Sequence, residues 1–243
     1  MSTPDSRSRG LAYGIFAYLV WGMFPLYWPL LKPAGAMEIL AHRITWSLVF
    51  LALLNSFRHN WSAIWRVLRD RRKLYLLGFA AILITINWGL YIWAVNADRV
   101  IDASLGYFMN PLINIGFGIL FFRERLRRAQ WVAVAIAALG VGWLTIDAGA
   151  LPWIGLTLGF SFGGYGAVKK LAAVDGVESL SVETLMLTPF AAAFLIWLEF
   201  SGQAAFGHAG VWQAIWCVMA QASSAALATP ITLYVHTCSQ RPA

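Results

Sequence analysis

Polar side chains recur at helical spacing inside apolar stretches of this chain. One set lies three or four residues apart and comprises Ser104, Tyr107, Asn110 and Asn114. This spacing predicts that they share one face of a helix. Because a polar group in hydrocarbon is costly, such a face is expected to meet an aqueous cavity or a neighbouring helix. Amides and aromatic rings around a cavity would suit a neutral or zwitterionic organic solute.

Further candidates for a substrate pathway lie in three other apolar stretches. Asn87 and Tyr91 are predicted to share a helical face, with Trp88 alongside. The complete candidate set is Trp21, Asn87, Trp88, Tyr91, Ser104, Tyr107, Asn110, Asn114 and Tyr165. The alternative is structural, because asparagine and serine also join helices by hydrogen bonds and aromatic rings also lie at membrane interfaces. Both explanations stay open for the face that contains Asn110, and the structural one is simpler for any single aromatic residue.

An ionisable cluster lies at the start of another apolar run. Glu38 and His42 are one helical turn apart, and Arg43 follows directly. Titratable groups inside membranes often carry protons, so Glu38 or His42 is a candidate for proton coupling. The simpler alternative places the cluster near the outer surface, with Glu38 hydrated and Arg43 extended toward the headgroups.

The sequence shows no constellation typical of an enzyme. Its histidines are scattered, and it contains no HExxH spacing, no Gly-rich phosphate loop and no GxSxG serine. Cys217 and Cys238 are interpreted as unpaired thiols, since no further metal ligand lies near them. We therefore expect no catalytic residue, no metal site and no cofactor.

The composition indicates that lipid surrounds the chain. Hydrophobic residues make up 60% of its 243 residues and charged residues 12%, with a mean hydropathy of +0.66. In a soluble domain about a quarter of the residues are usually charged. A chain this apolar cannot cover its surface with polar groups, which excludes an ordinary soluble protein.

Apolar runs of bilayer length organise the chain. Each is close to the ~20 residues of a spanning helix, and they lie at 11–31, 36–54, 74–95, 102–121, 129–147, 151–168, 179–200 and 211–235. These runs are too long for barrel strands, and a helix satisfies its own backbone polar groups in hydrocarbon. Internal prolines such as Pro111 and Pro189 favour kinked helices. The predicted fold class is an all-α polytopic membrane protein.

Lysine and arginine are distributed unevenly between the predicted loops. With the N-terminus inside, the inner segments carry 15 of the 18 basic residues, the outer loops carry Lys32 and Arg99, and Arg43 lies in a helix. This bias predicts a cytoplasmic N-terminus. The net charge of +7 is then explained by lipid headgroups, so nucleic acid is not an expected partner. On the inner side, Trp61 to Trp65, with Arg66 and Arg69, is predicted to form a short amphipathic helix on the membrane surface.

A weak internal repeat links the two halves of the chain. Gly14 and Gly22 in the first run have counterparts in Gly155 and Gly163 of the sixth run. The next run of each half begins with the same residue type, Glu38 in one and Glu183 in the other. Five helices separate the two copies, so the second copy enters the membrane from the opposite side. This pattern predicts an inverted-topology repeat, an architecture of many secondary transporters.

Several longer motifs carry a family resemblance. The segment from Ala103 to Leu112 (ASLGYFMNPL), followed by Arg123 to Leu126 and by Gln130-Trp131, resembles the fourth and fifth helices of the drug/metabolite transporter superfamily. Supporting segments lie at 17–28, 38–47, 87–96 and 161–166. The similarity is greatest to the EamA-type permeases of the RarD group, whose members are labelled chloramphenicol-sensitivity proteins.

The resemblance implies a ten-helix fold made of two inverted five-helix halves. We expect the first five-helix repeat at 1–148 and an incomplete second repeat of about three helices at 149–243, so that about eight of the ten helices are present. The family continues into a ninth and a tenth helix, whereas this sequence ends at Ala243 after a polar tail. Truncation after the eighth helix is the expectation that follows.

The expected function is a secondary transporter, or permease, of small organic metabolites or drugs in the bacterial inner membrane. Inactivity through truncation is left open, as is the alternative of a non-transporting membrane scaffold or inactive fragment. A membrane-embedded enzyme is disfavoured, because no clustered nucleophile, acid or metal site is found. The expected partners are a small-molecule substrate and the lipid bilayer, and a homodimer remains open.

Overall fold

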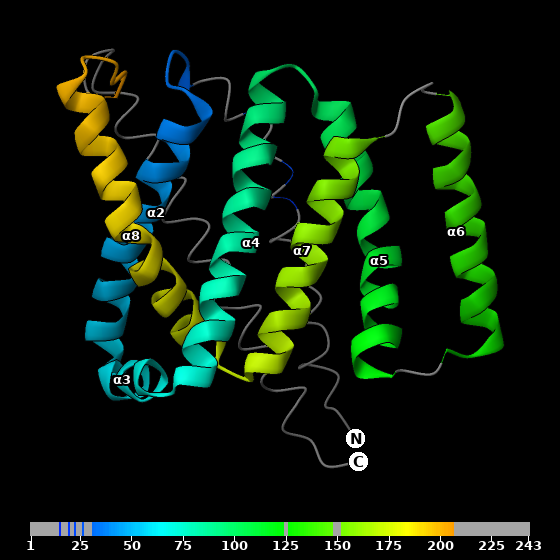
Figure 1. Ribbon diagram of the computed structural model, residues 1–243, viewed down its shortest axis with the longest axis horizontal. Coiled ribbons are helices and arrows are strands. Elements are labelled where there is room, and N and C mark those ends of the chain that lie inside the picture. Colours follow the sequence, from blue (N-terminus) through cyan, green and yellow to red (C-terminus); the bar gives the residue numbers. More distant parts are fainter. Residues whose placement is uncertain are drawn as a thin grey trace. The chain divides into compact units, whose positions relative to one another are not determined.

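The computed structural model describes residues 31–123, 126–147 and 152–206, together with positions 15, 19, 22 and 26 (Figure 1). Among these residues there are seven helices and no strand. The helices are α2 Ala36–Arg58, α3 Trp61–Arg69, α4 Arg71–Asn96, α5 Val100–Phe122, α6 Arg128–Asp147, α7 Trp153–Ala172 and α8 Gly176–Phe200. The all-α prediction is confirmed.

Six of the eight predicted runs coincide with helices of the structure, namely α2 and α4 to α8. The run at 11–31 lies mostly outside the described residues, and the run at 211–235 lies entirely outside them. Several helices extend beyond the predicted ends. Helix α2 continues to Arg58, α7 continues to Ala172, and α8 begins at Gly176. Hydropathy marks only the part of a helix in hydrocarbon, whereas the backbone stays helical where polar residues begin.

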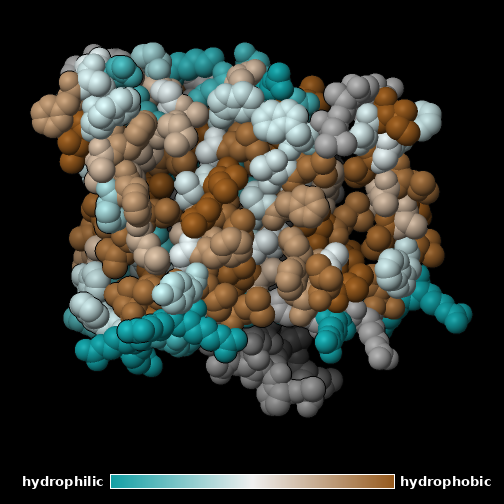
Figure 2. Space-filling view, in the orientation of Figure 1, coloured by the Kyte–Doolittle hydropathy of each residue, from teal (hydrophilic) through white to brown (hydrophobic). Residues whose placement is uncertain are grey.

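Four described helices are long and apolar enough to cross a membrane, namely α2, α4, α5 and α8. Helix α6 contains a shorter apolar stretch, Gln130–Trp143. Figure 2 shows hydrophobic side chains along the visible sides of the helices. Pro111 and Pro189 lie inside α5 and α8, as predicted, rather than at their ends.

The chain forms two compact units, and the first contains 1–74 and 174–243. In this unit α2 and α8 pack against each other in antiparallel orientation. Asn55 near the end of α2 contacts Ser181 near the start of α8, and Glu38 near the start of α2 contacts the turn after α8. Helix α3, whose formation was predicted, packs on α8. Figure 1 shows α3 nearly along its axis while α2 and α8 are seen from the side, so α3 runs across them.

The second unit contains 75–173, with most of α4 and all of α5, α6 and α7. Helices α5 and α7 run parallel, because Gly106 lies beside Gly155 and Ile113 lies beside Gly159 and Gly163. Glycine at every fourth position of α7 removes the side chains that would separate the two backbones, as is common in membrane helix pairs. We call this contact the glycine seam.

The two units do not coincide with the predicted repeats at 1–148 and 149–243. Packing defines the units, whereas sequence similarity defines the repeats, so the repeat assignment stays a prediction. The antiparallel contact of α2 with α8 is the orientation that an inverted repeat requires of the helices that contain Glu38 and Glu183.

In each unit most of the described basic residues lie at one end. In the first unit six of the eight lie at the end of α2, along α3 and at the start of α4, namely Arg58, Arg66, Arg69, Arg71, Arg72 and Lys73; the other two, Lys32 and Arg43, lie before α2 and in its first half. In the second unit they follow α5 or end α7, two parallel helices, and include Arg123, Arg127, Arg128, Lys169 and Lys170. The opposite end of the second unit carries Arg99, at the start of α5. Within each unit, this distribution agrees with the bias counted in the sequence.

Candidate functional site

The polar face predicted on α5 meets two different environments. Ser104 is exposed and donates a hydrogen bond to the carbonyl of Val100 in its own helix at 2.8 Å. Asn110 and Asn114 border the glycine seam, where Asn110 is half-buried and Asn114 is exposed. The Oδ1 of Asn114 lies 3.0 Å from the position of a Cβ built on Gly163. Tyr107 lies in α5 between Ser104 and Asn110, and its side chain is outside the described atoms.

Asn110 carries the clearest binding potential of this face. Its Oδ1 is buried and accepts no hydrogen bond from any residue that the structure describes. The next residue, Pro111, has no N–H, so the carbonyl of Tyr107 loses its usual helical donor. Two hydrogen-bond acceptors therefore lie within about one turn of α5. A buried acceptor without a protein donor is a place where a solute or water would be expected to donate.

Asn87 on α4 joins two helices. Its side chain is 3% exposed, and Nδ2 donates to the carbonyl of Leu158 at 2.8 Å and to Ser161 Oγ at 3.0 Å, both on α7. Ser161 in turn donates to the carbonyl of Thr157 at 2.6 Å. The Nδ2 group is thus occupied by protein acceptors, which favours the helix-joining role that the sequence left open.

The aromatic candidates are placed less uniformly. Tyr91 is buried and Trp88 is half-buried, and their rings meet edge to face with centroids 6.2 Å apart. Tyr165 on α7 is half-buried, with Lys169 Nζ 5.1 Å from the centre of its ring. Such a contact is a cation–π interaction at the basic end of the unit. Trp21 lies outside the described residues.

Glu38 and His42 form a separate site in the first unit. Glu38 is 4% exposed, and its Oε1 accepts hydrogen bonds from the backbone N–H groups of Ala205 and Phe206, each at 2.9 Å. The His42 ring lies against the ring of Phe206, with centroids 3.9 Å apart. The alternative of a hydrated Glu38 is therefore wrong, because the turn after α8 covers its carboxylate. Arg43 is half-buried rather than fully extended into solvent.

A second polar contact between α2 and α8 was missed by the sequence interpretation. Asn55 is buried, and its Nδ2 donates to Ser181 Oγ at 2.9 Å and to the carbonyl of Leu51 at 2.7 Å. The predicted apolar run ends at position 54, so the sequence places Asn55 in the loop that follows. Glu183 is 1% exposed and had been noted only as a repeat marker. A glutamate inside an apolar run, near its start, was the available signal for a buried ionisable group.

Within the described residues, no group of three or more His, Cys, Asp or Glu side chains is arranged to hold a metal ion. The described polar groups of interest are amides, hydroxyls, aromatic rings and two buried carboxylates, of which Glu38 lies one turn from the imidazole of His42. This set can bind and release a solute or a proton.

Comparison with known proteins gives a consistent result. Residues 8–146 match the EamA-like transporter family. Protein RarD of Streptomyces exfoliatus is 49% identical over 215 residues, which cover 88% of this chain and 68% of that protein. An uncharacterized transporter of Vibrio cholerae is 44% identical over 81% of this chain and 66% of its own length. Protein RarD of Escherichia coli is 41% identical over 86% and 70%, respectively.

The chain thus spans about two thirds of the length of these relatives. No solved structure matches it significantly.

Proposed function

Since the chain belongs to the EamA-like transporter family, we propose that it works as a secondary transporter of small organic metabolites or drugs. The single observation that carries a binding role is the buried, unpaired Oδ1 of Asn110 beside the proline-interrupted turn of α5. Acceptors of this kind suit a solute that donates hydrogen bonds. We do not assign an enzymatic reaction to the chain.

The proposed pathway is centred on Asn110. Asn114 and Tyr107 extend it along α5, and the Tyr91 and Trp88 rings of α4 are further candidates for its wall. Aromatic walls with few polar groups are typical of sites for drug-sized organic molecules. One relative, from Pseudomonas aeruginosa, is named chloramphenicol-sensitive protein RarD and is 32% identical over 203 residues. Chloramphenicol is therefore a rational first probe.

Transport can be tested in liposomes that contain the purified protein and a pH-sensitive dye. A panel of neutral and zwitterionic organic compounds, including chloramphenicol, is added outside, and both compound uptake and internal pH are followed. The proposed function requires at least one compound to cross faster than in vesicles that carry an Asn110→Leu variant. Equal rates for every compound would contradict it.

Asn110 and Asn87 are expected to respond differently to the same substitution. Asn110→Leu should reduce transport at least tenfold while membrane abundance stays unchanged, because it removes an acceptor that no described protein group uses. Asn87→Leu should instead lower stability by about 0.6–1.7 kcal/mol, the usual range for an interhelical hydrogen bond, since its partners Leu158 and Ser161 lose their donor.

Both variants are expressed from the gene's own locus, and transport is normalised to the quantity of protein in the membrane. Parallel loss of abundance and activity in Asn110→Leu would show that Asn110 acts in packing rather than in the pathway.

Proton coupling is proposed for Glu38, with His42 as the neighbouring titratable group. The Oε1 of Glu38 accepts hydrogen bonds from the backbone N–H groups of Ala205 and Phe206. Protonation would weaken both bonds, because bonds to an ionised acceptor are about twice as strong as neutral ones. A proton could thereby change how firmly the turn after α8 is held.

The basic ends of the two units support a proposal for the orientation in the membrane. We propose a multi-pass protein of the bacterial inner membrane with a cytoplasmic N-terminus. In a background without Cys217 and Cys238, Arg69→Cys and Arg127→Cys should resist an impermeant thiol reagent in intact cells, and Arg99→Cys should react. All three positions are exposed, so each should react after the membrane is opened. Labelling of the first two from outside would reverse the assignment.

A further inference from the structure

We propose that α3 and the first turn of α4 form a docking surface for the headgroups of anionic phospholipids. The surface comprises Trp61, Trp65, Arg66, Arg69, Arg71 and Arg72, and we call it the α3 corner. It lies wholly within the first compact unit. Its function is separate from the proposed transport pathway.

The α3 corner is held rigidly by its buried face. Ala63, Ile64 and Val67 are each almost fully buried, and α3 packs on α8. Two side-chain contacts fix its first turn. Asn60 Nδ2 donates to Glu178 Oε1 at 3.4 Å, and Trp61 Nε1 donates to Ser56 Oγ at 3.2 Å. The apolar face of this amphipathic helix is thus occupied by protein, and its opposite face is available to a ligand.

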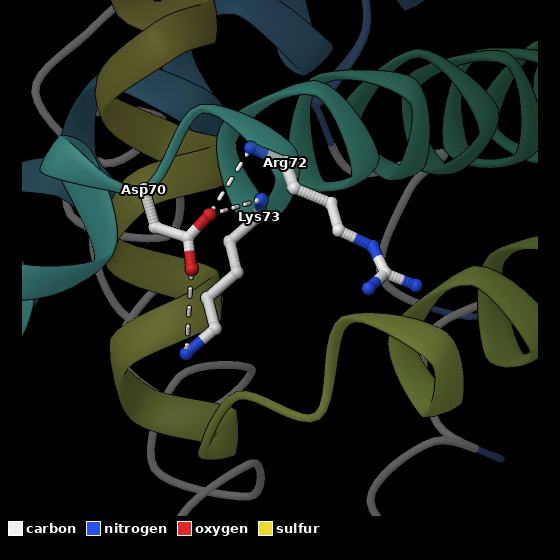
Figure 3. A network of polar contacts seen from close by, with 3 residues as sticks. All are labelled: Asp70, Arg72 and Lys73. Atoms are coloured by element: carbon white, nitrogen blue, oxygen red, sulfur yellow. Dashed lines mark hydrogen bonds and ion pairs between the residues drawn. The ribbon is translucent and has the colours of Figure 1, made fainter.

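Asp70 joins α3 to α4 and makes its described side-chain contacts with Arg72 and Lys73 (Figure 3). Its Oδ1 accepts hydrogen bonds from the backbone N–H groups of Arg72 at 3.1 Å and Lys73 at 3.3 Å, and its Oδ2 lies 3.9 Å from Lys73 Nζ. The guanidinium group of Arg72 points away from Asp70. Asp70 therefore caps α4 and pairs with Lys73, while Arg72 stays outside this contact.

The charge of the segment is strongly one-sided. Positions 58–73 contain six basic residues and one acidic residue, a net charge of +5. Arg66, Arg69, Arg71 and Arg72 are all exposed, and within the described residues none of them makes an ion pair. Figure 2 shows hydrophilic residues gathered along α3 and the start of α4. Among the described residues, these four arginines have no ionic partner of the opposite sign.

The tryptophans identify the partner as a lipid rather than a soluble anion. Trp61 and Trp65 are 42% and 60% exposed, beside the arginines on the same short helix. Exposed indole rings favour the headgroup level of a membrane, and guanidinium groups bind phosphate with two parallel hydrogen bonds. Helix α3 also runs across α2 and α8, two helices that can span the membrane. A helix in that orientation lies parallel to the membrane plane.

The test compares two arginine pairs in the purified full chain. Dioleoylphosphatidylglycerol and dioleoylphosphatidylcholine are titrated separately into protein in detergent, and bound lipid is counted by native mass spectrometry. The corner variant carries Arg69→Gln and Arg71→Gln. The matched control carries Arg127→Gln and Arg128→Gln, an exposed pair at the start of α6.

Neutralising the corner pair should weaken phosphatidylglycerol binding roughly 25-fold, about fivefold for each charge. The control pair should change it less than threefold, and phosphatidylcholine binding should change little in either variant. Trp65→Ala should weaken retention of phosphatidylglycerol severalfold, while 10 mM inorganic phosphate should leave it in place. Equal losses in both arginine variants, or displacement of lipid by phosphate, would overturn the proposal. Thermal unfolding of each variant verifies that the corner still folds.

Discussion

Replacing Gly106 with alanine is expected to destabilise the α5–α7 pair by about 1–2 kcal/mol. A Cβ at Gly106 would lie 2.8 Å from the carbonyl oxygen of Gly155 and 3.0 Å from its Cα. Both neighbours are backbone atoms, which cannot rotate away, so the two helices must move apart. Overpacking costs about 1–3 kcal/mol, and contact with backbone atoms that cannot rotate away places this case in the upper part of that range. The helix propensity of alanine, about 1 kcal/mol better than that of glycine, offsets only part of this cost.

Gly116→Ala is the matched control on the same helix. No described heavy atom outside the local helix lies within 4 Å of a Cβ at Gly116. This substitution should be neutral or stabilising by up to about 1 kcal/mol. Equilibrium unfolding in mixed micelles compares the two variants with the parent. If Gly106→Ala were as stable as Gly116→Ala, the glycine seam would not be the close contact described.

Removing the Glu38 side chain is expected to release the turn after α8. In Glu38→Ala, the backbone N–H groups of Ala205 and Phe206 lose their shared acceptor. Hydrogen bonds to charged groups contribute about 1.5–3 kcal/mol each, so hydrogen exchange at both amides should accelerate about ten- to hundredfold. Glu38→Gln keeps a neutral carbonyl oxygen and should accelerate exchange only severalfold.

The same experiment contains an internal reference. The amide of Ser201 donates to the carbonyl of Trp197 at 2.9 Å and serves as an internal reference. Exchange at Ala205 and Phe206 that follows Ser201 in all variants would exclude Glu38 as the holding group.

The sequence alone determined the class of protein and most of its helices. Apolar runs of bilayer length and a low content of charged residues allow only a helical membrane protein, since helices satisfy their backbone in lipid without partners. The stretch at 61–69 was predicted to be helical because its apolar and basic residues alternate with helical periodicity. The family could also be recognised from the sequence, because the motif from Ala103 to Leu112 is one continuous stretch of residues.

Only the tertiary structure separated polar residues that look alike in sequence. Asn87 and Asn110 both lie in apolar runs, yet Asn87 is bonded to α7 while the Oδ1 of Asn110 has no described donor. Asn55 was assigned to a loop and is buried between α2 and α8. For Glu38 the sequence left a proton-coupling role and a hydrated surface position open, and the carboxylate is covered by a turn that lies more than 160 residues later in the chain.

The physical reason for this division is the range of the interactions involved. Helix formation and membrane insertion depend on residues within one segment, so periodicity and hydropathy report them directly. The environment of a buried polar atom depends on which neighbouring helix supplies a donor or an acceptor. Gly155, Gly159 and Gly163 allow α7 to approach α5 closely, and that approach decides which faces of α5 are packed. No pattern within α5 alone contains this information.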